Sequence, residues 1–206
     1  SQFLTHVWHS EKMLVMRVFI AVLVFIFSLQ SWTRADDIRD FEIEGMSIGD
    51  SLLDYFNKEY IKKKKKYFNS DKGLKKEYSS IYYYKDKLKT YDNVRIYFKS
   101  KDTNYQIQAI TGYKYFKNNL EACISLKEII VSDIKKIFSN YTVKNYPNTQ
   151  LRGVKGTSDS DIFYDNVKKK ISVICYNYTD DKYRDRLSVL IQSEDFKDFQ
   201  KNRAFK

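Results

Sequence analysis

The chain has 206 residues, 31% of them charged and 17% aromatic, and its formal net charge is +11 at pH 7. Both histidines, His6 and His9, precede the residue at which we expect the mature protein to begin. A mature chain without histidine excludes hydrolases that use histidine as general base and zinc sites with histidine ligands. Two cysteines are too few for a four-cysteine zinc site, so we expect no metal and no cofactor.

The chain begins with features of an export signal. Arg17 precedes an apolar run, Val18–Leu29, and a more polar stretch then ends in small residues up to Ala35. This order predicts a secretory signal peptide that is cleaved after about Ala35, and hence a periplasmic or extracellular protein. The alternative is a retained membrane anchor, but the run is shorter than the ~20 apolar residues of a spanning helix, which favours cleavage. The expected parts are an extension translated upstream of the start at 1–12, the signal peptide at 13–35 and one domain at 36–206.

A first helix is expected from about Ser47 to Lys66. Apolar residues recur there at helical spacing, and a serine followed three positions later by Asp50 is a capping pattern. The apolar residues are Ile48, Leu52, Phe56 and Tyr60.

This helix contains the string Gly49-Asp50-Ser51-Leu52, which looks like the block that names the GDSL-type lipases. In that family the serine is the nucleophile, and a histidine in a late Asp-x-x-His block activates it. The sequence has neither that block nor the family's Gly-x-Asn-Asp block. We interpret the string as a helix N-terminus with Ser51 inside the helix. A hydrolase that uses only carboxylates is the enzymatic alternative, and the sequence singles out no pair of acids for it.

The remaining elements alternate between strands and helices. Apolar and aromatic patterning predicts strands at Tyr78–Tyr84, Asn93–Lys99 and Tyr105–Phe116, a helix at Asn119–Ser139, a long loop at 140–160, strands at Ile162–Asn166, Ile171–Tyr178 and Leu187–Gln192, and a short helix at Glu194–Lys201. This order, α-βββ-α-βββ-α, predicts an α+β domain whose antiparallel meanders are covered by helices on one face. The halves 41–117 and 118–201 could be a structural duplication, although no residue-level repeat is visible.

Residues 58–101 are basic and rich in tyrosine, and they include a run of five lysines: Lys62, Lys63, Lys64, Lys65 and Lys66. Such a segment could bind an anionic partner through charge and stacking. Because an exported protein meets little nucleic acid, the expected partners are anionic envelope polymers, lipid headgroups or another exported protein. The alternative is that the lysines form a solvated surface and the tyrosines belong to strands.

Two cysteines in an exported chain predict one disulfide, between Cys123 and Cys175. The alternative is a pair of buried free thiols.

The acidic stretch with Asp159, Asp161 and Asp165 does not fit a calcium loop, because Phe163 and Tyr164 stand where an oxygen ligand and a glycine are needed. We interpret it as a polar loop.

The stretches Asp40–Phe56 and Tyr105–Cys123, together with the strand around Cys175, resemble exported proteins of AT-rich marine bacteria of the Pelagibacter type. The resemblance implies a bacterial, exported protein and carries no activity, cofactor or catalytic residue. The sequence therefore favours a non-catalytic exported binding or interaction domain. Attachment to an anionic envelope polymer or to lipid headgroups through residues 58–101 is the more specific hypothesis.

Overall fold

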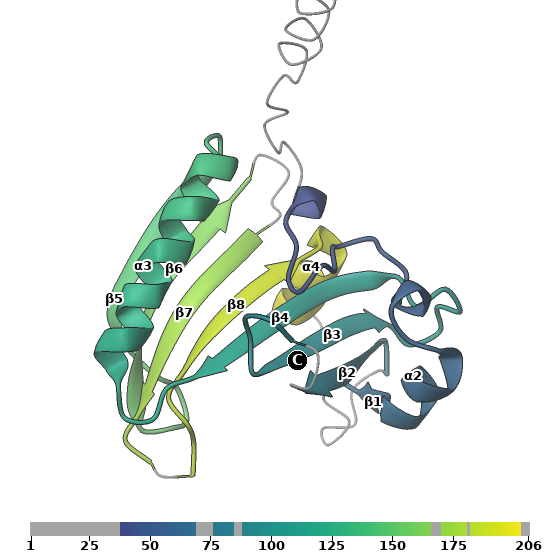
Figure 1. Cartoon of the computed structure of the whole chain (residues 1–206), viewed down its shortest axis with the longest axis horizontal. Helices are drawn as coiled ribbons and strands as arrows, with labels where there is room; N and C mark the ends of the chain where they lie inside the picture. Colours follow the sequence, from purple (N-terminus) through teal and green to yellow (C-terminus); the bar gives the residue numbers. More distant parts are fainter. Residues whose placement is uncertain (1–37, 69–75, 85–87, 166–169, 181, 203–206) are drawn as a thin grey trace, which may run out of the picture. The chain divides into compact units, whose positions relative to one another are not determined.

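The computed structural model describes residues 38–68, 76–84, 88–165, 170–180 and 182–202. The expected extension and signal peptide, residues 1–35, lie outside this part of the chain. The described residues form an α+β domain around an antiparallel eight-stranded sheet in the order β1-β2-β3-β4-β8-β7-β6-β5 (Figure 1). The strands are β1 (Lys66–Tyr67), β2 (Tyr78–Tyr84), β3 (Asn93–Lys99), β4 (Ile107–Tyr115), β5 (Thr142–Gln150), β6 (Gly156–Tyr164), β7 (Lys170–Tyr178) and β8 (Arg186–Gln192). The helices are α2 (Lys58–Lys64), α3 (Leu120–Ile137) and α4 (Glu194–Asn202), with 3₁₀ turns η1 (Ile38–Asp40) and η2 (Leu52–Asp54).

The sheet consists of two four-stranded meanders that meet at its centre. Strands β1 to β4 follow one another, as do β5 to β8, and β4 pairs with β8 over seven residue pairs from Ala109–Gln192 to Tyr115–Arg186. The expected halves 41–117 and 118–201 each contain one meander. Their origin by duplication stays a prediction.

The expected helix from Ser47 to Lys66 is wrong for residues 47–57, and only its second half forms a helix, α2 (Lys58–Lys64). Residues 47–56 run along the sheet and contain only the turn η2, and α2 begins after Asn57, whose side chain accepts a hydrogen bond from Tyr60 N at 2.8 Å. Tertiary backbone bonds replace the helical ones, because Gly49 N donates to Ile107 O at 2.9 Å and Ile107 N donates to the carbonyl of the next residue, Asp50, at 2.8 Å. Gly49 also has φ of +99°, which a helix cannot contain.

The long loop predicted at 140–160 is also wrong, because most of it forms β5 and the start of β6. Strand β5 is an edge strand with mostly exposed side chains, so it lacks the apolar alternation that marks a buried strand. Its proline, Pro147, lies at a register shift between Tyr146 and Thr149, where a missing N–H is tolerated. Strand β5 is the additional strand of the second meander, and the two-residue strand β1 is that of the first. Each meander has four strands where three were expected.

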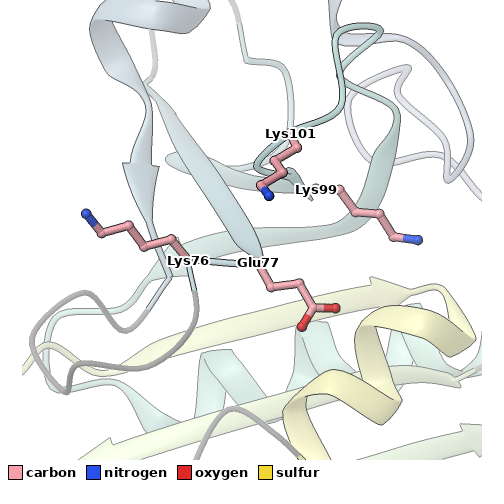
Figure 2. Close-up of a pocket in the computed structure, with 4 residues that line it drawn as sticks. All are labelled: Lys76, Glu77, Lys99 and Lys101. Atoms are coloured by element: carbon pink, nitrogen blue, oxygen red, sulfur yellow. The ribbon is translucent and has the colours of Figure 1, made fainter.

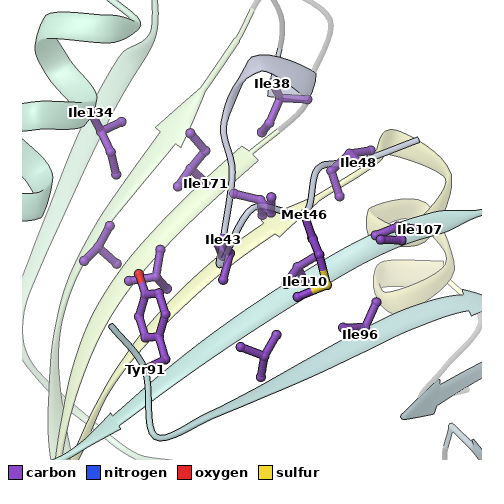
Figure 3. Packing of buried hydrophobic residues seen from close by; sticks show 14 of the residues in the cluster. Ile38, Ile43, Met46, Ile48, Tyr91, Ile96, Ile107, Ile110, Ile134 and Ile171 are labelled. Carbon is purple, nitrogen blue, oxygen red and sulfur yellow. The ribbon is translucent and has the colours of Figure 1, made fainter. Parts of the chain in front are cut away.

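Helices cover both faces of the sheet, which corrects the expectation of one covered face. Ile96 and Tyr97 are neighbours in β3, but alternation places them in different core clusters. The larger cluster lies under α3 and the segment 38–56, and Figure 3 shows Ile43 and Met46 of that segment beside Ile110 of β4. The smaller cluster lies under α4, where Phe196 packs on Tyr97 at a ring-centroid distance of 4.8 Å. No helix among the described residues is long and apolar enough to cross a membrane.

Two contacts fasten α3 to the second meander. The expected disulfide between Cys123 and Cys175 is present, with an S–S distance of 2.09 Å. One helical turn further, the buried Lys127 Nζ donates to Asp159 Oδ1 at 2.6 Å and to Asp161 Oδ2. Burial alone would lower the pKa of Lys127, but the two carboxylates outweigh it and the pKa is raised, so the lysine stays charged.

Removing the disulfide should destabilise the domain mainly through the unfolded chain. The cysteines are 52 residues apart, and in the chain-entropy model a loop of this length is worth about 4 kcal/mol. We expect the double variant Cys123→Ala/Cys175→Ala to lose up to that much unfolding free energy in urea titrations. A loss of the same size in the wild type on reduction would assign the effect to the cross-link, whereas no loss on reduction would contradict it.

Removing the buried lysine should cost far more than removing an exposed one. Lys127→Ala leaves two carboxylates without their cation, for which we expect a loss of about 3–5 kcal/mol in unfolding free energy. The matched control is Lys136→Ala, which breaks the exposed pair with Asp133 (2.9 Å) and should cost about 0.5 kcal/mol or less. Equal losses in the two variants would show that Lys127 is not the anchor of α3.

Candidate functional site

One sheet surface combines tyrosines and arginines and is not covered by α3. It lies on the face that also carries α4, beyond the area that α4 contacts. We call it the Tyr/Arg face, and it consists of Tyr82, Arg95, Thr111, Tyr113, Tyr115, Tyr176, Tyr178 and Arg186. Strand register brings these residues together, because Arg95 pairs with Thr111, and Arg186 pairs with both Tyr115 and Tyr176.

Both arginines of this face lie against tyrosine rings. The Arg95 guanidinium carbon is 4.9 Å from the Tyr82 ring centroid, and that of Arg186 is 5.2 Å from the Tyr113 centroid and 5.3 Å from the Tyr176 centroid. These distances are typical of cation–π contacts, which hold a guanidinium flat and leave its N–H edge available.

The arginines have no anionic partner within the described part of the chain. Arg95 Nε donates to the Ser80 hydroxyl at 3.2 Å, and Arg186 Nη2 donates to the Tyr178 hydroxyl, also at 3.2 Å. Arg186 Nε is buried and has no hydrogen-bond acceptor among the residues that the structure describes. No Asp or Glu occupies the described positions of β2, β3, β4, β7 and β8 that alternate onto this face. The described part of this face is therefore positively charged.

Three phenols of this face, those of Tyr113, Tyr176 and Tyr178, have a raised pKa. Burial, together with the neighbouring Tyr178, raises the pKa of Tyr176 to about 12, although Arg186 opposes the shift. Burial likewise raises the pKa of Tyr113 and of the adjacent Tyr97. At neutral pH these side chains are hydroxyl donors, so they add hydrogen-bonding capacity without adding negative charge.

A cavity of about 440 Å³ adjoins the Tyr/Arg face at Tyr115 and Tyr178. It lies between the turn from β4 to α3 and the loop from β7 to β8. Its other lining residues are Phe116, Lys117, Asn118, Asp180, Tyr183, Arg184 and Asp185. The buried Asp185 carboxylate accepts the backbone N–H of Tyr178 at 2.7 Å, which fixes the loop at the cavity wall.

The five-lysine run does not form one uniform surface. Lys62, Lys63 and Lys64 are exposed on α2, and Lys66 is exposed in β1. Lys65 is half-buried, and its Nζ donates to Ser100 O at 2.7 Å. Lys65 therefore has a structural contact, and the other four lysines remain available for an anion.

A second cavity, of about 500 Å³, is lined by residues of the same basic segment (Figure 2). Figure 2 shows that the Lys76 and Lys99 side chains extend in opposite directions, with Glu77 between them. Lys99 is paired with Asp195 at 2.8 Å, and Lys101 is a further lining residue within the described part of the chain. Because the amines diverge, this cavity does not present a common anion-binding point.

The Gly49–Leu52 string holds loops together. Ser51 is the N-cap residue of η2 and does not lie inside a helix, which corrects the expectation. Its hydroxyl donates to Asn104 O at 2.7 Å and accepts from Leu53 N at 3.1 Å, so it has no contact with a base. The Asp50 carboxylate accepts from Ser47 N and from the Tyr55 hydroxyl, at 2.8 and 2.6 Å.

The acidic stretch 159–165 lies in β6 and at its end, where a polar loop was expected. Asp159 and Asp161 bind Lys127, and Asp165 accepts from the Tyr141 hydroxyl at 3.3 Å. No cluster of three or more potential metal ligands occurs among the described residues.

Our sequence reasoning missed the Tyr/Arg face, because its residues come from five strands of both meanders. A partial signal was present: Tyr176 and Tyr178 alternate in one predicted strand, and Arg186 precedes the next.

Comparison with known proteins gives no match, since no family model, curated protein or solved structure corresponds to this chain.

The raised tyrosine pKa values predict loss of stability at alkaline pH. An unfolded tyrosine ionises near ~10, so the stability that these phenols contribute is full below that pH and is lost as the pH rises through their folded values. We expect phenolate absorbance and loss of circular dichroism to rise together between about pH 10 and 12. Tyr176→Phe should lessen the loss of stability at alkaline pH, and the control Tyr146→Phe, at an exposed tyrosine, should leave that loss unchanged. Complete ionisation near pH ~10 with the fold intact would contradict this account.

Proposed function

We propose that the domain is a non-catalytic exported binding module that attaches to an anionic polymer of the cell envelope through the Tyr/Arg face. The observation that carries the proposal is the pair Arg95 and Arg186, which have no carboxylate partner among the described residues. A partly buried cation without a counter-ion costs folding free energy, so its retention favours a role in binding.

The disulfide supports the expected compartment, because such bonds persist where the surroundings are oxidising. In the envelope the abundant partners of a positive surface are acidic polymers. The exposed lysines Lys62–Lys64 and Lys66 would add long-range attraction, which depends on salt. The Tyr/Arg face would supply the short-range contacts, because stacked guanidinium groups present fixed N–H donors.

The proposal is tested by co-sedimentation of the purified protein with bacterial envelope fractions at low and high salt. We expect binding that weakens with salt and falls about tenfold or more in Arg95→Gln/Arg186→Gln, because each lost charge-assisted hydrogen bond is worth about 1.5–3 kcal/mol. The comparison variant, Lys62→Gln/Lys63→Gln/Lys64→Gln, should weaken binding about threefold or less, since exposed charges contribute little.

If the lysine variant loses binding and the arginine variant keeps it, the attachment surface is the basic segment and not the Tyr/Arg face. Circular dichroism of both variants controls for folding. An absence of envelope binding at either salt concentration would overturn the proposal.

A further inference from the structure

The rings next to Arg186 form a track that leads into the 440 Å³ cavity. Tyr176 and Tyr178 are near-parallel, with 5.8 Å between ring centroids and 11° between ring planes. Tyr178 and Tyr183 continue the row at 5.2 Å and 27°. Arg186 contacts the first two rings, and Tyr178 and Tyr183 line the cavity.

The cavity differs chemically from a simple anion site. Lys117 and Arg184 lie at its wall, but so do the acids Asp180 and Asp185 and the amide Asn118. Two acids beside two cations weaken the attraction for a bare phosphate or sulfate. Asp180 and Asn118 are good partners for hydroxyl groups, because a carboxylate accepts O–H donors and an amide both donates and accepts.

Flat rings beside mixed polar groups suit a pyranose sugar. A sugar ring has an apolar C–H face that packs against the electron-rich face of an aromatic ring, and its hydroxyls point outward to polar side chains. A cavity of about 440 Å³ lies within the ~300–1,000 Å³ range of small-molecule sites, which is room for a terminal sugar.

We infer that the anionic polymer is an acidic polysaccharide, an inference that rests on the proposed function. Its carboxylate pairs with the Arg186 guanidinium, which has no carboxylate partner among the described residues. A sugar ring packs against Tyr183, the exposed end of the stacked row, and the end of the chain enters the cavity, where Asp180 and Asn118 bind hydroxyls. An acidic polypeptide would use the arginines but would gain little from this ring track.

The test compares fluorescently labelled alginate oligosaccharides, which are uronate polymers, with poly-L-glutamate, dextran sulfate and neutral dextran in anisotropy titrations of the purified protein. We expect alginate to bind at least tenfold more tightly than the other three probes at equal ionic strength. Tyr183 is 37% exposed on a loop, so Tyr183→Ala should leave the fold intact. That variant should lose about tenfold in alginate affinity, and Tyr183→Phe should keep it within about twofold.

The matched control is Tyr146→Ala, which removes a tyrosine of similar exposure (43%) from the edge strand β5 and should change no affinity. If poly-L-glutamate or dextran sulfate binds as tightly as alginate and Tyr183→Ala affects none of them, the sugar inference is overturned, while an Arg95/Arg186-dependent anion site stands. If no polyanion binds and Arg95→Gln/Arg186→Gln changes nothing, the proposed function fails as well.

Discussion

The pairing of β4 with β8 is the contact on which both the core and the Tyr/Arg face depend. It joins the two meanders through strands that are far apart in sequence, and it fixes which side chains share a face. In one register, Ile110 and Ile191 lie together in the core while Tyr115 and Arg186 lie together on the opposite face. If the pairing of β4 with β8 shifted by one residue, the core side chains of one strand would move to the opposite face. Burial of the apolar residues therefore also fixes which residues of the Tyr/Arg face lie side by side.

The core side of this contact does not tolerate a residue larger than glycine at position 112. At Gly112 of β4, an added Cβ would lie 2.7 Å from Tyr91 Cδ1, so only glycine lets that ring pack on the strand. The backbone leading to Tyr91 is held by Glu44, whose carboxylate accepts three N–H groups at 2.7 to 2.9 Å. Such well-satisfied contacts on one face help to offset the cost of keeping, on the other, two arginines that have no carboxylate partner among the described residues.

The sequence predicted those elements whose pattern is local. Strands β2, β3 and β7 have runs of aromatic and β-branched residues, and α3 has an apolar period with Asn119 as its N-cap. The disulfide followed from two cysteines and an expected export signal. The first helix failed because bonds to β4 outweighed helical spacing, and β5 failed because an exposed edge strand needs no apolar alternation. The Tyr/Arg face is non-local, since its register is set only when β4 meets β8.

The two meanders are unequally secured. The disulfide and the buried Lys127 pair both tie α3 to the second meander, whereas the first meander contains no cysteine. Local opening should therefore begin in the first meander, whose amide hydrogens should exchange with solvent sooner than those of the second. The Tyr/Arg face takes Arg95 from the less secured part and Arg186 from the more secured part. A polymer that contacts both arginines would oppose that opening, so binding at the face would be thermodynamically linked to the rigidity of the first meander.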